Sequence, residues 1–313
     1  MVTEAALTFP NIDPVLIQIW GPIAIRWYSL SYVALLLIGW WAIVRMLHEK
    51  ALWTNPPFKG KPPATPDDIG DFVVWITFGV ILGGRLGWVI FYGTILCSVS
   101  PDGAMCHNGA YPGAFLTNPL NIISAWDGGM SFHGGLIGVV VATLWFTHRR
   151  KLATFQIGDL LCVVAPIGMF LVRMANFING ELWGRPTDVP WAMVFCNDTI
   201  KRLHDGQCPD PPGMVARHPS QLYEAALEGI VLFIIMQVGL RVFRLHEKPG
   251  VLTGMLFLFY GLFRVFVEFF REPDAPFLGP ITMGQMLSSL MWIGGAFFLW
   301  YALWRKPALA AKP

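Results

Sequence analysis

Seven stretches of mainly apolar residues, each long enough to cross a bilayer as a helix, constrain this chain more than any other feature. A membrane-spanning helix needs about 20 consecutive apolar residues, because the hydrocarbon layer is ~30 Å thick and each residue adds ~1.5 Å. Charged residues make up only 13% of the chain, against about 25% in soluble domains. The sequence therefore predicts an all-α, polytopic membrane protein with about seven transmembrane helices, at residues 23–46, 72–92, 130–148, 157–178, 220–242, 252–270 and 285–304.

The distribution of Lys and Arg predicts which way these helices run. Short cytoplasmic loops retain an excess of the two residues. If the N-terminus lies outside, the cytoplasmic segments hold 13 of the 22 Lys and Arg residues and the outside segments hold 5. The pattern therefore favours a multi-pass protein with its N-terminus outside and its C-terminus in the cytoplasm.

A single membrane-embedded domain, residues 1–313, is the simplest organisation of the chain. Residues 182–217 connect two predicted helices on the outside and are too many for a turn. Their Trp, Pro and Gly content suggests a small folded structure. We therefore expect an extracytoplasmic arm, or small subdomain, at residues 182–217.

The cysteines indicate disulfides on the outer face. Cys97, Cys106, Cys196 and Cys208 lie in predicted outside segments, whereas Cys162 lies within a predicted helix. Outside the cytoplasm, four cysteines are enough for two disulfides. Of the three pairings, we favour Cys97–Cys106 and Cys196–Cys208, because each closes a short loop; free thiols in inserted loops remain the alternative.

Polar residues interrupt the apolar stretches at one depth. A charge at the centre of a membrane helix costs at least ~2.5–3.5 kcal/mol, so such residues usually serve a function. In the predicted orientation the inner halves of the helices are nearly uniformly apolar. A pocket in the outer leaflet is therefore expected, rather than a path across the membrane. Its polar residues are Arg85, Arg173, Arg264 and Glu268 in outer halves of helices, and Tyr28, His133, Tyr223 and Glu224 in first turns.

Structural roles are expected for three polar side chains, of which Arg85 belongs to the polar layer just described. Arg85, in the sequence G-G-R-L-G, is expected to pair with a carboxylate. Glu228 lies deeper than the pocket residues, and His218 precedes a predicted helix as a cap or loop anchor. No zinc-binding, nucleophile-elbow or phosphate-binding motif is found in the sequence. We expect no metal, no cofactor and no nucleic acid partner.

Four motifs carry a resemblance to a known family. They read W-D-G-G-M-S-F-H-G-G-L-I-G at residues 126–138, R-M-A-N-F-I-N-G-E-L-W-G at 173–184, R-H-P-S-Q-L-Y-E at 217–224 and Y-G-L-F-R-V-F-V-E-F-F-R at 260–271. The four motifs occur in this order, and the similarity spans about residues 22–285. In these features the chain resembles the bacterial prolipoprotein diacylglyceryl transferases. One departure is Val172, where the family usually has Gly before the arginine of the second motif.

The resemblance implies transfer of the diacylglyceryl group of phosphatidylglycerol to the lipobox cysteine thiol of prolipoproteins. A thioether forms and glycerol phosphate leaves. It implies a place in the bacterial cytoplasmic (inner) membrane, with the active site at the outer leaflet. The expected partners are phosphatidylglycerol, lipobox-containing signal peptides of prolipoproteins and membrane lipid.

The resemblance, set beside the chemistry, also assigns site residues. Arg173 and Arg264 suit a phosphodiester, because a guanidinium donates paired hydrogen bonds and keeps its charge. His133 is the candidate base for the thiol, with Glu181 and Glu268 as competitors. The catalytic candidates are His133, Arg173, Arg264, Glu268, Glu181 and Tyr28, and those for binding phosphatidylglycerol are Arg173, Asn176, Asn179, Gly184, Arg264 and Tyr260.

Structural explanations stay open for the same residues. Arg264 and Glu268 are spaced i,i+4, so the two charges could neutralise each other. Asn176 and Asn179 could hydrogen-bond between helices, and tyrosines are enriched at membrane interfaces without any catalytic role. His133 could be a hydrogen-bonded histidine that orients its loop.

Two other classes of protein would also place arginines in a membrane. A lipid or anion transporter predicts flux across vesicles and a polar route to the inner face. A non-catalytic lipid-binding or assembly protein would account for the arginines and the arm without chemistry. An assay with phosphatidylglycerol and a lipobox peptide separates these classes from a transferase.

Overall fold

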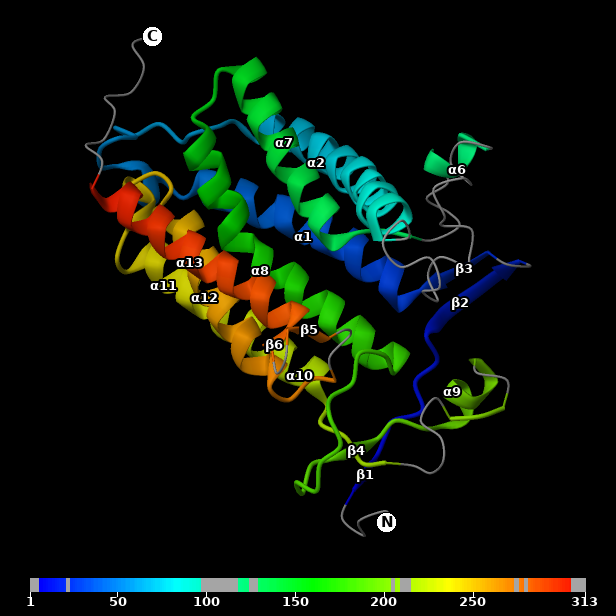
Figure 1. Cartoon of the computed structure of the whole chain (residues 1–313). Helices are drawn as coiled ribbons and strands as arrows, with labels where there is room; N and C mark the ends of the chain where they lie inside the picture. The colour runs from blue at the N-terminus through cyan, green and yellow to red at the C-terminus, as the bar shows by residue number, and fades with distance from the viewer. Residues whose placement is uncertain are drawn as a thin grey trace. The chain divides into compact units, whose positions relative to one another are not determined.

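The computed structural model describes residues 6–20, 23–96, 118–123, 129–203, 206–208, 215–272, 276–278 and 281–304. The chain forms two compact units, one of Met1–Pro62 with Gly158–Pro313 and the other of Pro63–Ile157. Long helices dominate both, with a few short strands (Figure 1).

The bounds of the elements are as follows. The long helices are α1 (Trp27–His48), α2 (Pro66–Gly87) with its π-helical continuation η2 (Trp88–Leu96), α7 (Phe132–Arg150), α8 (Thr154–Asn179), the continuous run α10 (Ser220–Glu224), η4 (Ala225–Val231) and α11 (Leu232–Arg241), then α12 (Val251–Glu268) and α13 (Met283–Trp304). The short helical elements are η1 (Lys50–Trp53), α6 (Leu120–Ile123), α9 (Asp198–Leu203) and η5 (Leu245–Glu247). The strands are β1 (Leu7–Thr8), β2 (Val15–Trp20), β3 (Ile23–Arg26), β4 (Met193–Val194), β5 (Pro276–Leu278) and β6 (Ile281–Thr282).

The predicted polytopic helical fold is confirmed. Within the described residues, six helices are long and apolar enough to cross a membrane. The seventh predicted span, residues 130–148, is helical as α7 but is not among those six. The six are Trp27–His48, Pro66–Phe91, Thr154–Asn179, Ser220–Arg241, Val251–Glu268 and Gly284–Trp304.

The first predicted helix begins too early. Residues 23–26 form strand β3, which pairs antiparallel with β2, and α1 begins only at Trp27. The prediction of a helix from residue 23 was therefore wrong. An apolar run alone does not distinguish a helix from a short strand, and the isoleucines of this segment fit a strand well.

Helix α2 begins six residues before the predicted start at residue 72. Thr65 and Asp68 form a capping box, in which Asp68 N donates to Thr65 Oγ1 (3.2 Å) and Thr65 N donates to Asp68 Oδ2 (3.0 Å). Pro66 occupies the first helical position, where its missing N–H costs nothing. The polar first turn carries these signals, and hydropathy does not detect them.

In the unit Pro63–Ile157, glycines set the packing of α2 against α7. A Cβ on Gly83 would lie 2.4 Å from the Gly134 carbonyl oxygen, and one on Gly138 would lie 1.9 Å from that of Gly79. The four-residue spacing on both helices is the small-residue pattern by which membrane helices pack closely. This contact fixes the first turn of α7, which carries His133.

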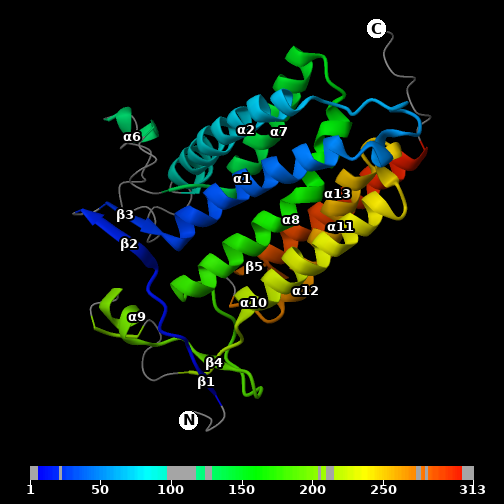
Figure 2. The same ribbon diagram turned by 180° about the vertical axis from the view of Figure 1, so that it is seen from behind.

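In the larger unit, α12 lies beside α11 and α13, as Figure 1 and Figure 2 both show. The start of α12 is held by Asp159 of α8. The carboxylate of Asp159 is buried and accepts hydrogen bonds from Gly250 N (2.7 Å), Thr253 N (2.8 Å) and Thr253 Oγ1 (2.7 Å). It therefore caps a neighbouring helix, with a negative charge at the positive end of the helix dipole.

We expect Asp159→Asn to destabilise the protein by on the order of 2–3 kcal/mol, because an amide offers one acceptor and places donors against N–H groups. The apparent unfolding temperature in detergent measures the loss. Asp67→Asn is the control, since Asp67 is exposed in the first turn of α2. Equal unfolding temperatures for the two variants would contradict the capping role.

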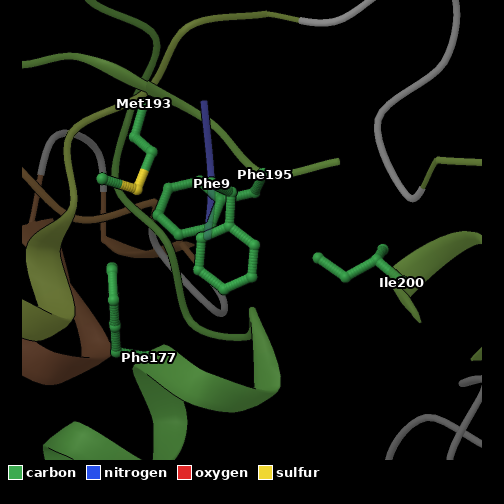
Figure 3. Packing of buried hydrophobic residues seen from close by; sticks show 5 residues of the cluster. All are labelled: Phe9, Phe177, Met193, Phe195 and Ile200. Atoms are coloured by element: carbon green, nitrogen blue, oxygen red, sulfur yellow. The ribbon is translucent and has the colours of Figure 1, made fainter. Parts of the chain in front are cut away.

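The described parts of residues 182–217 fold together with the N-terminal segment. Strand β4 pairs parallel with β1, in the register Leu7 to Met193. Figure 3 shows the cluster beneath this pairing, in which the rings of Phe9 and Phe177 have centroids 5.3 Å apart. The members of the cluster are Phe9, Phe177, Met193, Phe195 and Ile200.

Cys196 and Cys208 form a disulfide within this segment, with their Cα atoms 5.5 Å apart. The predicted pairing of these two cysteines is confirmed. Cys162 is a free, buried thiol in α8, as predicted. The predicted pair Cys97–Cys106 lies outside the described residues.

Candidate functional site

Helices α8, α10–η4 and α12 bring five charged side chains into one chain of alternating sign. In order they are Glu228, Arg173, Glu224, Arg264 and Glu268, and we name them the arginine–glutamate cluster. Arg173 Nε lies 3.1 Å from Glu224 Oε2, and Arg173 Nη2 lies 3.5 Å from Glu228 Oε2. Arg264 donates through Nη1 to Glu224 and lies 3.0 Å from Glu268 Oε2 through Nη2. Glu224 is thus shared by both arginines.

The cluster is withdrawn from solvent. The side chains of Glu224 and Glu228 are at most 1% exposed, and that of Arg264 is 10% exposed. Arg173 is the most accessible member, at 17%. Its Nη1 has no hydrogen-bond partner among the described residues, so Arg173 retains a donor that can bind an anion.

Close packing lets α8 reach the two glutamates. A Cβ on Gly229 would lie 2.7 Å from the Cβ of Phe170, which leaves no room for a side chain between η4 and α8. The π-helical turn of η4 begins directly after Glu224 and contains Glu228. Such turns are frequent at functional sites, because they shift side chains out of the regular helical register.

Tyrosines surround the arginines. Tyr260 is buried on α12, one turn before Arg264, and the charges of both arginines act on its hydroxyl. On α1 the Tyr32 hydroxyl donates to the Tyr28 hydroxyl (3.2 Å), and the charge of Arg173 acts on Tyr32. Helix α1 therefore brings the Tyr32 phenol within electrostatic reach of the accessible arginine, with Tyr28 hydrogen-bonded to Tyr32; of the two, the sequence indicated only Tyr28.

Glu181 follows the end of α8 and is held by three amides. Asn176 Nδ2 and Asn179 Nδ2 donate to its Oε1 at 2.9 and 3.0 Å, and Gln221 Nε2 donates to its carbonyl oxygen (2.6 Å). Glu181 is exposed, whereas Asn176 is buried. The two asparagines thus orient the Glu181 carboxylate in this structure, eight residues after Arg173.

Gly184 lies where the arm crosses two other segments. The Gly184 N–H donates to the His218 carbonyl oxygen (2.8 Å), and the Gly184 carbonyl oxygen accepts a hydrogen bond from Arg217 Nη1 (3.1 Å). A Cβ would lie 2.5 Å from the Phe270 carbonyl oxygen. Backbone therefore occupies the space around Gly184, and any larger residue would push these segments apart.

His218 anchors the loop before α10, as predicted. Its Nδ1 lies 3.0 Å from the Tyr223 hydroxyl, which also accepts a hydrogen bond from Trp191 Nε1 (2.7 Å). The ring packs edge-on against Phe270. Partial burial lowers the pKa of His218 below its ordinary value, so this ring is neutral at physiological pH.

The unit Pro63–Ile157 holds the candidate His133 and also Arg85, for which a structural role was expected. His133 lies in the first turn of α7, where Ser131 Oγ caps the helix by accepting from Gly134 N (3.2 Å). Its ring is partly exposed, and no described residue hydrogen-bonds to it. Arg85 donates to the carbonyl oxygens of Ile122 and Gly129, both at 3.1 Å. These bonds show Arg85 fastening the segments that precede α7.

The sequence predicted part of this site. The i,i+4 spacing of Arg264 and Glu268 left an ion pair open as one of two explanations, and the structure contains that pair. The sharing of Glu224 and the contact of Glu228 with Arg173 were missed. Their signal was the i,i+4 pair of carboxylates on one apolar helix, a charged face that calls for cations on a neighbouring helix. Among the described residues, no group of His, Cys, Asp and Glu is arranged to hold a metal ion.

Comparisons with known proteins agree with the motifs. The family model for prolipoprotein diacylglyceryl transferase matches residues 14–301. Proteins named phosphatidylglycerol–prolipoprotein diacylglyceryl transferase from Phenylobacterium zucineum, Rhodospirillum rubrum and Brucella anthropi are 47%, 48% and 42% identical to this chain. The alignments cover 97%, 96% and 100% of this chain and 98%, 96% and 98% of those proteins. The chain belongs to the prolipoprotein diacylglyceryl transferase family.

Proposed function

We propose that this membrane protein transfers the diacylglyceryl group of phosphatidylglycerol to the lipobox cysteine of prolipoproteins, the first step of bacterial lipoprotein maturation. The observation that carries the proposal is the buried arginine–glutamate cluster between apolar helices. A lipid donor presents an anionic phosphodiester at the end of two acyl chains. Apolar helices can take the chains, and Arg173 offers the phosphodiester a donor that no described residue occupies.

In this reaction the thiolate sulfur attacks the glyceryl carbon that bears the phosphate. A carbon–sulfur bond forms, the carbon–oxygen bond breaks, and its electron pair leaves on glycerol phosphate. Negative charge grows on the departing phosphate, so a fixed guanidinium stabilises the transition state more than the bound lipid. Glu224 holds Arg173 and Arg264 in place, so neither has to reorganise during the step.

The acceptor thiol must lose its proton before attack. A cysteine thiol has a pKa of ~8.5, so only a minority is ionised at neutral pH. We assign the base to His133, whose residue type suits proton transfer near neutral pH. The competing carboxylates are engaged, because Glu268 is paired with Arg264 and Glu181 accepts from two asparagine amides. The thiol proton would then pass to the imidazole.

We also propose that the N-terminus and residues 182–217 lie outside and the C-terminus in the cytoplasm. The pairing of β1 with β4 requires the two segments to share one side of the membrane. An even number of membrane crossings must then lie between β1 and β4. Helices α1, α2 and α8 supply three, which supports α7 as the fourth crossing. The Cys196–Cys208 disulfide supports an oxidising side for this segment.

On the same proposed orientation, the site would lie in the outer leaflet. Arg173 lies six residues before the end of α8, Glu224 is in the first turns of its helix, and Glu268 ends α12. Arg173 is therefore near the helix end that leads into the arm, Glu224 is near the helix start that follows the arm, and Glu268 is at the end of α12. On this proposal residues 1–313 form one transferase domain, and residues 182–217 are the arm above the site, where a lipobox signal peptide would approach.

The test is a transfer assay with purified protein, vesicles that contain phosphatidylglycerol, and a peptide with a lipobox cysteine. The peptide should gain one diacylglyceryl group through a thioether, which mass spectrometry detects, and glycerol phosphate should appear in equal amount. A lipid flux without peptide modification would favour a transporter, and binding without either would favour a non-catalytic lipid-binding protein.

A further prediction concerns the base. His133→Gln should lower turnover with little change in lipid binding, and the loss should shrink as the pH rises toward ~8.5, where the thiol ionises unaided. The measurement is the pH profile of kcat for the variant against the unmodified protein. A loss that is constant over the whole range would instead assign His133 to positioning.

A further inference from the structure

The arginine–glutamate cluster holds more acids than bases. Three carboxyl groups face two guanidiniums, so with every group ionised the cluster would carry one net negative charge. An uncompensated charge is costly within the apolar part of a membrane protein. It would also repel the phosphate of an anionic lipid. One carboxyl group is therefore expected to carry a proton.

Two of the carboxyl groups are well compensated. Glu224 places one oxygen on each arginine, at Nη1 of Arg264 and Nε of Arg173. Glu268 is paired with Arg264 and lies at the start of α13, where a Cβ on Gly284 would be 2.6 Å from Glu268 Oε1. A helix N-terminus favours a negative charge. Both surroundings stabilise the ionised form.

Glu228 is poorly compensated. Among the described residues its one ion pair is with Arg173 Nη2 at 3.5 Å, the limit of a hydrogen bond. The buried oxygens Glu224 Oε2, Glu268 Oε2 and Glu228 Oε1 all lack a hydrogen bond within the described part of the chain, but the first two lie 3.1 and 3.0 Å from an arginine nitrogen, whereas Glu228 Oε1 has no ion pair there. The groups that face it are Arg173 from α8, Arg264 and Tyr260 from α12, and Glu224 from its own helix. Of the three carboxyl groups, Glu228 loses least by binding a proton.

We propose that Glu228 is a neutral carboxylic acid in the resting protein and acts as a positioning residue for the lipid donor. While Glu228 is neutral, three carboxyl groups and two arginines sum to zero, and Arg173 can turn its free Nη1 toward a phosphodiester. When Glu228 ionises, it competes with the lipid phosphate for Arg173. The consequence for lipid binding rests on the proposed function, whereas the protonation state does not.

Infrared difference spectroscopy tests the protonation state without any activity. A protonated carboxyl group gives a carbonyl band that shifts in D2O and is distinct from a carboxylate band. The purified protein at neutral pH should show this band, Glu228→Gln should lose it, and the control Glu272→Gln should keep it, because Glu272 is exposed and paired with Arg217. A band that persists in Glu228→Gln, or its absence from the unmodified protein, would overturn the proposal.

Kinetics tests the consequence. The KM for phosphatidylglycerol should rise severalfold in the unmodified protein as the pH is raised from neutral to about 9, as Glu228 loses its proton. Glu228→Gln cannot ionise, so its KM should stay constant over that range. If KM rises equally in both proteins, Glu228 does not control lipid binding. If neither protein transfers lipid at all, the proposed function fails while the infrared result still stands.

Discussion

Arg173→Lys is expected to lower kcat/KM for diacylglyceryl transfer by about 100-fold or more, while the protein keeps its fold and inserts normally. The lysine retains the charge but presents one compact ammonium group. It cannot contact Glu224 through one nitrogen and the lipid phosphate through another in a fixed fork. Each tenfold loss corresponds to ~1.4 kcal/mol of transition-state stabilisation, so 100-fold is in the range of one or two lost charged hydrogen bonds.

The measurement is kcat and KM in vesicles with a lipobox peptide. We expect kcat to fall as well as KM to rise, because the arginine acts most strongly on the departing phosphate. Arg202→Lys is a matched control, since Arg202 is an exposed arginine of α9 outside the cluster, and its activity should stay within about twofold. Near-normal activity in Arg173→Lys would remove Arg173 from the proposed mechanism.

Glu224→Gln is expected to have the largest effect on stability, a loss of about 3–5 kcal/mol. Glu224 is fully buried and is the one carboxylate in contact with both arginines of the cluster. An amide of the same shape removes the negative charge and leaves two guanidiniums beside each other in an apolar setting. The effect should appear as a lower unfolding temperature in detergent and a lower yield of folded protein.

Glu272→Gln serves as the control for this variant too, because Glu272 pairs with Arg217 but is about half exposed. Exposed ion pairs contribute only ~0–1 kcal/mol, so its unfolding temperature should hardly change. If Glu224→Gln unfolds at the normal temperature, Glu224 is not the central partner of the two arginines. Transfer activity should fall with stability in Glu224→Gln, since both arginines lose their orientation.

The sequence predicts local features of this protein well. The spans follow from runs of apolar residues, and the pair of Arg264 with Glu268 follows from its spacing on one helix. Cys196 and Cys208 are close in sequence, so their disulfide could also be predicted. Each of these depends on residues within about one loop or one helical turn of each other.

Features that depend on packing between distant segments were not predictable in this way. The i,i+4 spacing of Glu224 and Glu228 calls for a cation on a neighbouring helix, but it does not identify Arg173 as that cation. Arg173 reaches the two glutamates where Gly229 lets two helices approach closely. The β2–β3 hairpin was hidden because an apolar strand and the start of an apolar helix have the same hydropathy. The early start of α2 was not predicted because its first turn is polar, and hydropathy detects only apolar runs.

The core of the arm has a consequence for how the protein is made. Phe9 precedes every membrane-spanning helix, whereas Phe177, Phe195 and Ile200 follow the end of α8 or lie close to it. A ribosome must therefore synthesise some 190 residues after Phe9 before the ring finds its partners. On the proposed orientation, the N-terminal segment would therefore be outside the membrane before its hydrophobic partners have been synthesised. This core can therefore form only late in synthesis, after the first membrane helices have been made and only if both of its segments reach the same side of the membrane.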